Sequence, residues 1–260
     1  MLQLRTWCCA VLAALLWNSA AVAATYDEQR AAEVERIRAE FMSTDYETRI
    51  QSARELMYSG ITDESLFNPI AIRMLKLYVV VRDNGGMHDG QEMAWYAKAL
   101  ASSGNPRYGK ILLELSQQPK GAIGAEFRHI GQSAHLIYSF EKWNLVINGS
   151  TPPPPDSDWF VTTTANLLNS GDVDLRREGA KRAGAMGKQH PAVFDVVAAR
   201  LEADFMFQIR DREEADTLAW HCRALGESDN PKYRPLLERV QREAASRTVR
   251  GYAADALKKI

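Results

Sequence analysis

The stretch AWYAKALASSGNPRY at residues 94–108 returns 125 positions later as AWHCRALGESDNPKY at residues 219–233. Eight of the fifteen positions are identical, and they include Trp95 and Trp220. Self-similarity at a fixed spacing is typical of repeat architectures, in which stacked units present a binding surface. We therefore predict a chain of repeated units, with the two tryptophans as its first candidate functional residues.

Three further segments share an arginine that is followed, three and four residues later, by two small side chains. The arginines are Arg49, Arg176 and Arg250, and the small pairs are Ser52-Ala53, Gly179-Ala180 and Ala253-Ala254. This pattern resembles the first helix of HEAT repeats, where paired small residues let neighbouring helices approach closely. The resemblance implies that the arginines make contacts between successive repeats. The alternative is that they form, together with Arg128, a basic ladder for an acidic ligand.

Helix signals run along most of the chain. Asn105-Pro106 and Asn230-Pro231 each place a capping asparagine before a proline at the first helical position. Apolar residues recur at helical spacing, and no segment alternates with a period of two between hairpin turns. We expect an all-α fold, and the HEAT resemblance implies a right-handed α-solenoid of helix pairs.

The expected helices fall into two blocks of six. They lie near residues 27–42, 46–59, 63–81, 90–103, 105–117 and 122–137, and near 158–169, 172–187, 191–207, 211–226, 230–245 and 247–259. The series Ala53, Gly60, Phe67, Ala71 and Arg73 recurs at one constant offset as Ala180, Gly187, Phe194, Ala198 and Arg200, which predicts a tandem duplication. The predicted domains are a signal peptide (1–24), a first HEAT-like block (25–137), a proline-rich linker (138–157) and a second block (158–260).

Residues 1–24 have the pattern of a secretory signal. Arg5 precedes the apolar run 7–17, and the small residues 21–24 suit cleavage. The run is shorter than the roughly 20 residues that a membrane-spanning helix needs. We therefore expect a periplasmic or secreted protein without a transmembrane segment after cleavage, although an uncleaved anchor stays open. Cleavage would leave Cys222 as the one cysteine, so no intramolecular disulfide is expected.

The charge balance excludes one class of partner. Without Arg5 the chain would carry 31 basic and 33 acidic side chains. A nucleic-acid-binding protein needs a strong basic stripe to displace counterions from the phosphates. We therefore expect no nucleic-acid partner.

The sequence contains no motif that requires catalysis, a cofactor or a metal. It lacks His-Glu-x-x-His, the His-Glu pairs of HEAT-like di-iron hydroxylases, the Gly-x-Ser-x-Gly elbow and the phosphate loop. His88, Asp89 and Glu92 offer polar ligands, but we interpret them as a helix start, with Asp89 capping and Glu92 completing a capping box. His221 and Cys222 point about 100° apart on a helix, so adjacency does not pair the thiol with the imidazole. Cys222 corresponds to Ala97, one of the small positions of the repeat, and we expect a buried small side chain there.

Trp95 and Trp220 remain the candidate recognition face, because aromatic side chains dominate binding energetics. The alternative is that both indoles only pack between repeats. We expect a non-catalytic protein- or peptide-binding scaffold of the cell envelope, whose partner is another envelope protein or peptide. The competing hypothesis is a small-molecule receptor or enzyme that uses the groove between the two blocks. In residues 27–42, Val34, Ile37 and Phe41 form an apolar stripe that is expected to cover an open end of the array.

Overall fold

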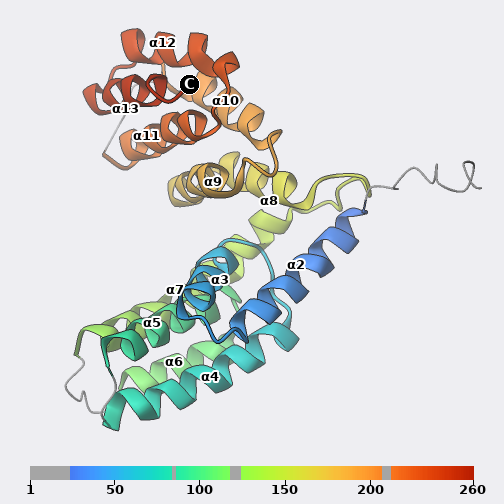
Figure 1. The fold of residues 1–260 in the computed structure, drawn as a ribbon, viewed down its shortest axis with the longest axis vertical. Helices are drawn as coiled ribbons and strands as arrows, with labels where there is room; N and C mark the ends of the chain where they lie inside the picture. Colours follow the sequence, from blue (N-terminus) through green and yellow to red (C-terminus); the bar gives the residue numbers. More distant parts are fainter. Residues whose placement is uncertain (1–23, 84–85, 118–123, 207–211) are drawn as a thin grey trace, which may run out of the picture.

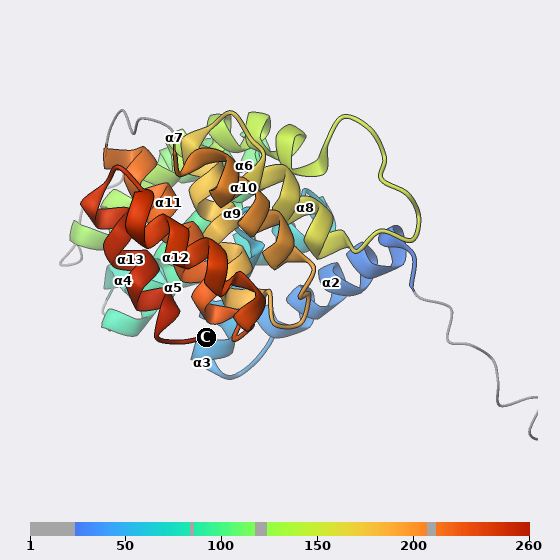
Figure 2. The same cartoon turned by 90° about the horizontal axis from the view of Figure 1, so that it is seen from above.

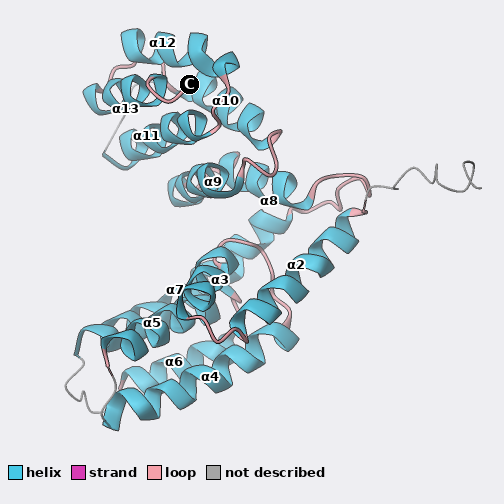
Figure 3. Ribbon diagram, viewed as in Figure 1, coloured by secondary structure: helices cyan, strands magenta, loops and turns pink. Residues whose placement is uncertain are grey.

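The computed structural model describes residues 24–83, 86–117, 124–206 and 212–260. Within these ranges the chain forms helices and loops, and no strand occurs there (Figure 3). The predicted all-α class is therefore confirmed. The α-helices are α2 (Tyr26–Phe41), α3 (Tyr46–Leu56), α4 (Glu64–Asp83), α5 (Met87–Ser102), α6 (Pro106–Ser116), α7 (Gly124–Asn148), α8 (Trp159–Leu168), α9 (Val173–Met186), α10 (Val193–Asp204), α11 (Arg212–Glu227), α12 (Arg234–Glu243) and α13 (Arg247–Leu257), and a short 3₁₀ helix, Pro231–Tyr233, precedes α12.

The helices stack along the long axis of the molecule (Figure 1). Helices α10–α13 lie at one end and α4–α6 at the other, with α2, α3, α8 and α9 between them. Helices α9, α11 and α13 pack in sequence, as do α3, α5 and α7, and α2 packs against α8. One cluster of buried apolar side chains reaches from Val34 in α2 to Ala256 in α13. The core is therefore continuous along the stack.

The helix starts follow from side-chain caps. Asn105 accepts a hydrogen bond from the Arg107 amide at 3.0 Å, as predicted for an asparagine before proline. Asp158 accepts from the Val161 amide at 2.9 Å and so begins α8. Each cap satisfies an amide that has no partner inside its own helix.

Small residues set the spacing between neighbouring helices. A Cβ atom on Gly179 of α9 would lie 2.9 Å from the Leu167 Cβ of α8, which is too close for an ordinary contact. Ala53 and Ala180, the second members of their small pairs, are fully buried. The close approach predicted from the paired small residues is therefore present.

The two parts of the chain repeat the same contacts at corresponding positions. The rings of Phe67 and Tyr108 lie 6.0 Å apart, and the corresponding rings of Phe194 and Tyr233 lie 6.5 Å apart. The hydroxyl of Tyr108 contacts the residue after Phe67, Asn68, at 2.9 Å. That of Tyr233 contacts the residue after Phe194, Asp195, at 3.0 Å. Tyr108 and Tyr233 thus pack in the core.

Helix α7 is longer than predicted. It continues to Asn148 rather than ending near residue 137, so the predicted linker is helical from its first residue to Asn148. Phe140 and Ile147 are fully buried, and Asn144 between them donates to the Ser102 carbonyl at 2.9 Å. The spacing of Phe140 and Ile147, two helical turns apart, was the sequence signal that the prediction missed. The loop that follows α7 extends to the start of α2 (Figure 2). There the Tyr26 amide donates to the Pro155 carbonyl.

Helix α2 does not cover an open end, and that prediction is wrong. Its stripe of Val34, Ile37 and Phe41 is buried as expected. However, α2 packs against α3, α4 and α8, and it lies in the middle of the stack (Figure 1). The reason is that α8 and α9 dock on the α2–α3 pair, where Arg182 donates to the Glu55 carbonyl at 3.4 Å.

The repeated arginines also differ from expectation. Arg49, Arg176 and Arg250 each donate to two carbonyl groups in the loop that precedes their own helix, five and six residues back. Arg49 also donates to another helix, through Glu92 of α5. What the three arginines share is therefore the capping of a loop, not a link between successive repeats. The Arg128 side chain lies outside the part of the chain that is described.

The predicted signal peptide, with Cys8 and Cys9, falls outside the described residues except for Ala24. Among the helices that are described, none combines the length and the apolar character needed to cross a bilayer.

Candidate recognition site

Trp95 and Trp220 occupy equivalent places on two helices of the stack. Trp95 lies on α5 and Trp220 on α11, and each indole is partly buried against the main core. Neither is fully buried, so the structure leaves part of each ring accessible. Partial exposure of both indoles is compatible with packing between helices and with recognition of a partner.

Two cations flank each indole, and they come from corresponding positions. For Trp95 they are Arg54 of α3, with its guanidinium 4.8 Å from the ring centre, and Lys98 of α5, with its ammonium at 4.2 Å. For Trp220 they are Lys181 of α9 at 5.3 Å and Arg223 of α11 at 4.7 Å. A cation within about 6 Å of a ring centre is attracted by the ring quadrupole. The pattern of one cation from the preceding stacked helix and one from the next turn thus occurs twice.

Three of these four cations have no carboxylate partner among the described residues: Arg54, Lys98 and Arg223. Lys181 pairs with Glu178 at 2.7 Å. The pKa of Lys98 is lowered by burial and by the nearby positive charge of Arg54. Burial disfavours the charged form of a lysine, and a like charge nearby adds to this effect. Two positive charges, those of Lys98 and Arg54, therefore lie beside the Trp95 indole.

A cavity of about 280 Å³ opens beside Trp95. It is bounded by α3, α5 and α7, and Glu178 of α9 closes one side. It therefore lies where the two parts of the chain meet. Besides Glu178 its lining consists of Arg54, Met57, Tyr58, Trp95, Lys98, His129, Gln132, Ser133 and Leu136.

Glu92 does not complete a capping box, contrary to the prediction. Helix α5 begins after Gly86, whose amide donates to Asp89 at 3.0 Å, while Glu92 turns into the interior and is only 3% exposed. Burial opposes the charge of Glu92, but hydrogen bonds from Arg49 (2.6 Å) and Tyr96 (2.6 Å) outweigh it and lower the pKa of Glu92. The residue is therefore part of a buried ion-pair network.

His221 and Cys222 are both fully buried in α11. The His221 Nδ1 atom lies 2.7 Å from the Thr217 carbonyl, and burial lowers the pKa of His221 to about 4. Burial also raises the pKa of the Cys222 thiol to about 12. The prediction that Cys222 is a buried small side chain is confirmed. Within the described ranges, no three His, Cys, Asp or Glu side chains gather closely enough to hold a metal ion.

The sequence identified the indoles but missed their cations. The signal was present in the sequence. Arg54 and Lys181 directly follow Ala53 and Ala180, which are equivalent positions, and Lys98 and Arg223 each lie three residues after their tryptophan. Each of these two pairs has an arginine in one copy and a lysine in the other, so a search for identical residues did not detect them. Which helix supplies the second cation could be known only from the packing of α3 on α5 and α9 on α11.

Comparison with known proteins adds little beyond the helical fold. No family model matches the chain, and no curated protein matches it. Among solved structures, human deoxyhypusine hydroxylase in complex with glycerol is 16% identical, with a TM-score of 0.35 over 87% of this chain and 83% of its own. An engineered protein is 17% identical, with a TM-score of 0.29 over 87% of this chain and 96% of its own. At such low scores neither structure carries an argument about this protein.

Proposed function

We propose that this protein is a non-catalytic scaffold of the cell envelope that binds an acidic segment of another protein through Trp95 and Trp220. The carrying observation is the duplicated geometry of a partly exposed indole flanked by two cations. A residue pattern needed only for packing would not require charge at both flanks. Aromatic and cationic side chains together supply both apolar contact area and charge attraction for such a partner.

The proposed architecture is a right-handed solenoid of two tandemly duplicated HEAT-like blocks. The repeated Phe–Tyr contacts, the repeated loop-capping arginines and the two cation–indole clusters support duplication, because they recur at corresponding positions of the two parts. Stacked repeats expose extended surfaces. Two copies of one recognition unit would therefore engage two points of the same partner.

A second candidate is a receptor for a small acidic molecule at the cavity beside Trp95. Side chains from both parts of the chain line this cavity. Lys98 and Arg54 supply two positive charges there, against the one carboxylate of Glu178. This alternative uses one indole, whereas the scaffold uses both. The role of Trp220 therefore separates the two candidates.

The test is site-specific photo-crosslinking in the native cell envelope. A photoreactive residue replaces Lys98 or Arg223, and a matched probe replaces Lys110, which is exposed on α6. We expect the first two probes to trap the same protein and the Lys110 probe to trap none. Charge reversal of the neighbouring Arg54 should weaken the product at Lys98 by about tenfold, in line with the loss of a favourable charge contact.

Two results would contradict the scaffold. Crosslinks of equal yield at Lys110 would mean that the indoles have no special role. Recovery of a small acidic molecule that depends on Trp95 but not on Trp220 would establish the receptor instead. Thermal unfolding of each variant, measured in parallel, shows whether a loss of product reflects binding or folding.

A further inference from the structure

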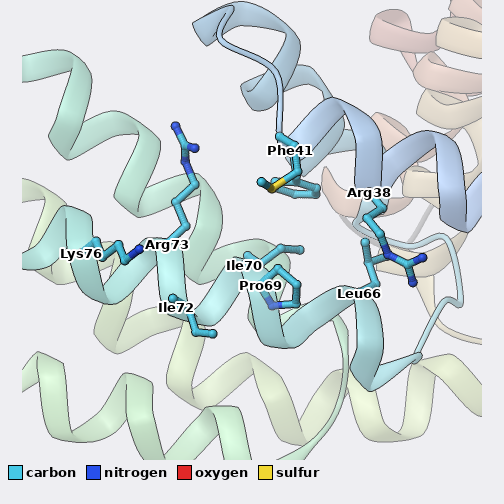
Figure 4. A pocket seen from close by; sticks show the side chains of 9 residues that line it. Arg38, Phe41, Leu66, Pro69, Ile70, Ile72, Arg73 and Lys76 are labelled. Atoms are coloured by element: carbon cyan, nitrogen blue, oxygen red, sulfur yellow. The ribbon is translucent and has the colours of Figure 1, made fainter.

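A second cavity, of about 410 Å³, lies on another part of the molecule, where the end of α2 meets the side of α4 (Figure 4). Ligand sites for small molecules span about 300–1,000 Å³. Six of the lining residues are apolar and the other three are cationic; the lining residues are Arg38, Phe41, Met42, Leu66, Pro69, Ile70, Ile72, Arg73 and Lys76. No carboxylate is among them.

The lining separates apolar and charged surface. Pro69 and Ile70 lie in the middle of the cavity, Arg73 and Lys76 lie toward one end, and Arg38 lies at the other (Figure 4). Arg73 and Lys76 are three residues apart on α4 and therefore share one helix face. The cavity thus offers an apolar trough with a pair of cations at one end.

The charge at that end is available to a ligand. Arg38, at the opposite end, is already held by Glu35 and by Ser65 at 3.0 Å. Arg73 contacts Glu92 at 3.1 Å but keeps 37% of its side chain exposed. Lys76 is exposed, and within the described residues it forms no ion pair with a carboxylate. The uncompensated charge is therefore at Lys76.

Two large apolar side chains of the trough are exposed to solvent. Met42 is 68% exposed and Ile72 is 56% exposed, whereas Phe41, Leu66 and Ile70 are buried beneath them. At the offset that relates Ala53 to Ala180, the positions equivalent to Arg38, Ile72 and Lys76 are all alanine, namely Ala165, Ala199 and Ala203. The three alanines lie within α8 and α10. The longer side chains of Arg38, Ile72 and Lys76 are therefore not needed to form the corresponding helices.

We propose that this trough binds one long-chain carboxylate molecule, with its carboxylate between Lys76 and Arg73. Its hydrocarbon chain lies along Ile72 and Pro69 toward Met42, the exposed apolar residues of the lining. The occupant needs an anionic head because the only charges in the lining are positive, and a long apolar body because the rest of the lining is apolar. This site is separate from the tryptophan face and does not depend on the function proposed there.

The experiment is calorimetric titration of the purified protein with dodecanoate below its micelle concentration, with dodecanol and dodecyltrimethylammonium as matched ligands. We expect one dodecanoate per chain, and binding of dodecanol about tenfold weaker because the alcohol lacks the charge. Lys76→Glu should lower the affinity for dodecanoate by about tenfold and leave the affinity for dodecanol unchanged. Ile72→Asp should weaken both, because it places a charge in the trough.

Lys142→Glu, at an exposed position of α7, is the matched control for a change of surface charge and should leave all three affinities as they are. Equal binding of the three amphiphiles, or equal weakening by Lys142→Glu, would overturn the proposal. Binding to anionic phosphatidylglycerol vesicles without binding of free dodecanoate would overturn it as well, because the occupant would then be a membrane surface. Circular dichroism of each variant confirms that the fold is retained.

Discussion

At the scale of single residues, equivalent positions carry different chemistry. Tyr96 and His221 correspond to each other in the repeated stretch, and both are fully buried. The Tyr96 hydroxyl donates to the carboxylate of Glu92, whereas the Nδ1 atom of His221 lies beside the carbonyl of Thr217. The Nε2 atom of His221 has no hydrogen-bond partner among the described residues. Tyr96 thus belongs to a charged hydrogen-bond network, whereas the equivalent residue His221 is a neutral imidazole.

His221 should make stability depend on pH. Its pKa in the folded protein is about 4, below the usual 6.5, because burial disfavours the charged ring. Between pH 6.5 and 4 the unfolded chain binds a proton that the folded chain refuses, so the free energy of unfolding falls as the pH falls. The contribution reaches about 3 kcal/mol at most. Urea unfolding across this range should show a smaller fall for His221→Leu than for the unsubstituted protein. Parallel curves would contradict the assignment.

At the scale of helices, close approach at small residues decides the geometry. Gly179 lies inside α9, and a Cβ atom there would lie 3.0 Å from the Leu168 amide nitrogen as well as 2.9 Å from the Leu167 Cβ. Backbone atoms cannot move aside as a flexible side chain can. A Cβ atom on Gly251, inside α13, would have nothing within 4 Å. The two glycines differ in what faces them.

Gly179→Ala should destabilise the protein although alanine is the better helix former. The gain in helix propensity is about 0.5–1 kcal/mol, and overpacking costs about 1–3 kcal/mol. Gly251→Ala is the matched control and should raise the free energy of unfolding, because it keeps the gain without the clash. Urea midpoints measure both. A stabilising Gly179→Ala would show that α8 and α9 can separate at little cost.

At the scale of the whole molecule, α2 joins the loop before α8 to the first part of the stack. The Gln29 side chain donates to the Ser157 carbonyl at 3.3 Å and accepts from the Trp159 amide at 2.9 Å. The Tyr26 amide donates to the Pro155 carbonyl at 2.7 Å. Trp159 is the first residue of α8, so its amide has no partner within the helix. A single glutamine thus fixes both the loop and the start of α8.

Gln29→Ala should loosen this junction. We expect the free energy of local opening at the Trp159 amide to fall by about 1–2 kcal/mol, because a buried donor loses its acceptor. Hydrogen exchange followed by NMR measures this residue by residue. The control is Gln51→Ala, which removes only an exposed contact with Glu55 and should leave Trp159 unchanged. A uniform loss of protection along the chain would instead mean global destabilisation.

Much of the fold could be predicted because its determinants are local. The caps at Asn105 and Asp158 act within one helical turn, and the apolar periodicity of each helix is visible in the sequence itself. The extension of α7 was missed because the neighbouring prolines suggested a linker that began too early. The docking of α2 between the two parts could not be predicted, since it depends on α8, a helix far along the chain, returning to pack against it.

The sequence by itself determined the helices, their small-residue contacts and the repetition of Trp95 at Trp220, because helix formation and close packing follow from nearby residue types. Only the tertiary structure decided what surrounds those tryptophans and what lines the trough on α4. Arg54 contacts Trp95, and Phe41 and Ile70 line the same cavity. The residues of each pair are far apart in the sequence, and no local pattern predicts that they come together. Such contacts arise from the way whole helices stack, and this depends on the combined packing of every side chain in the core.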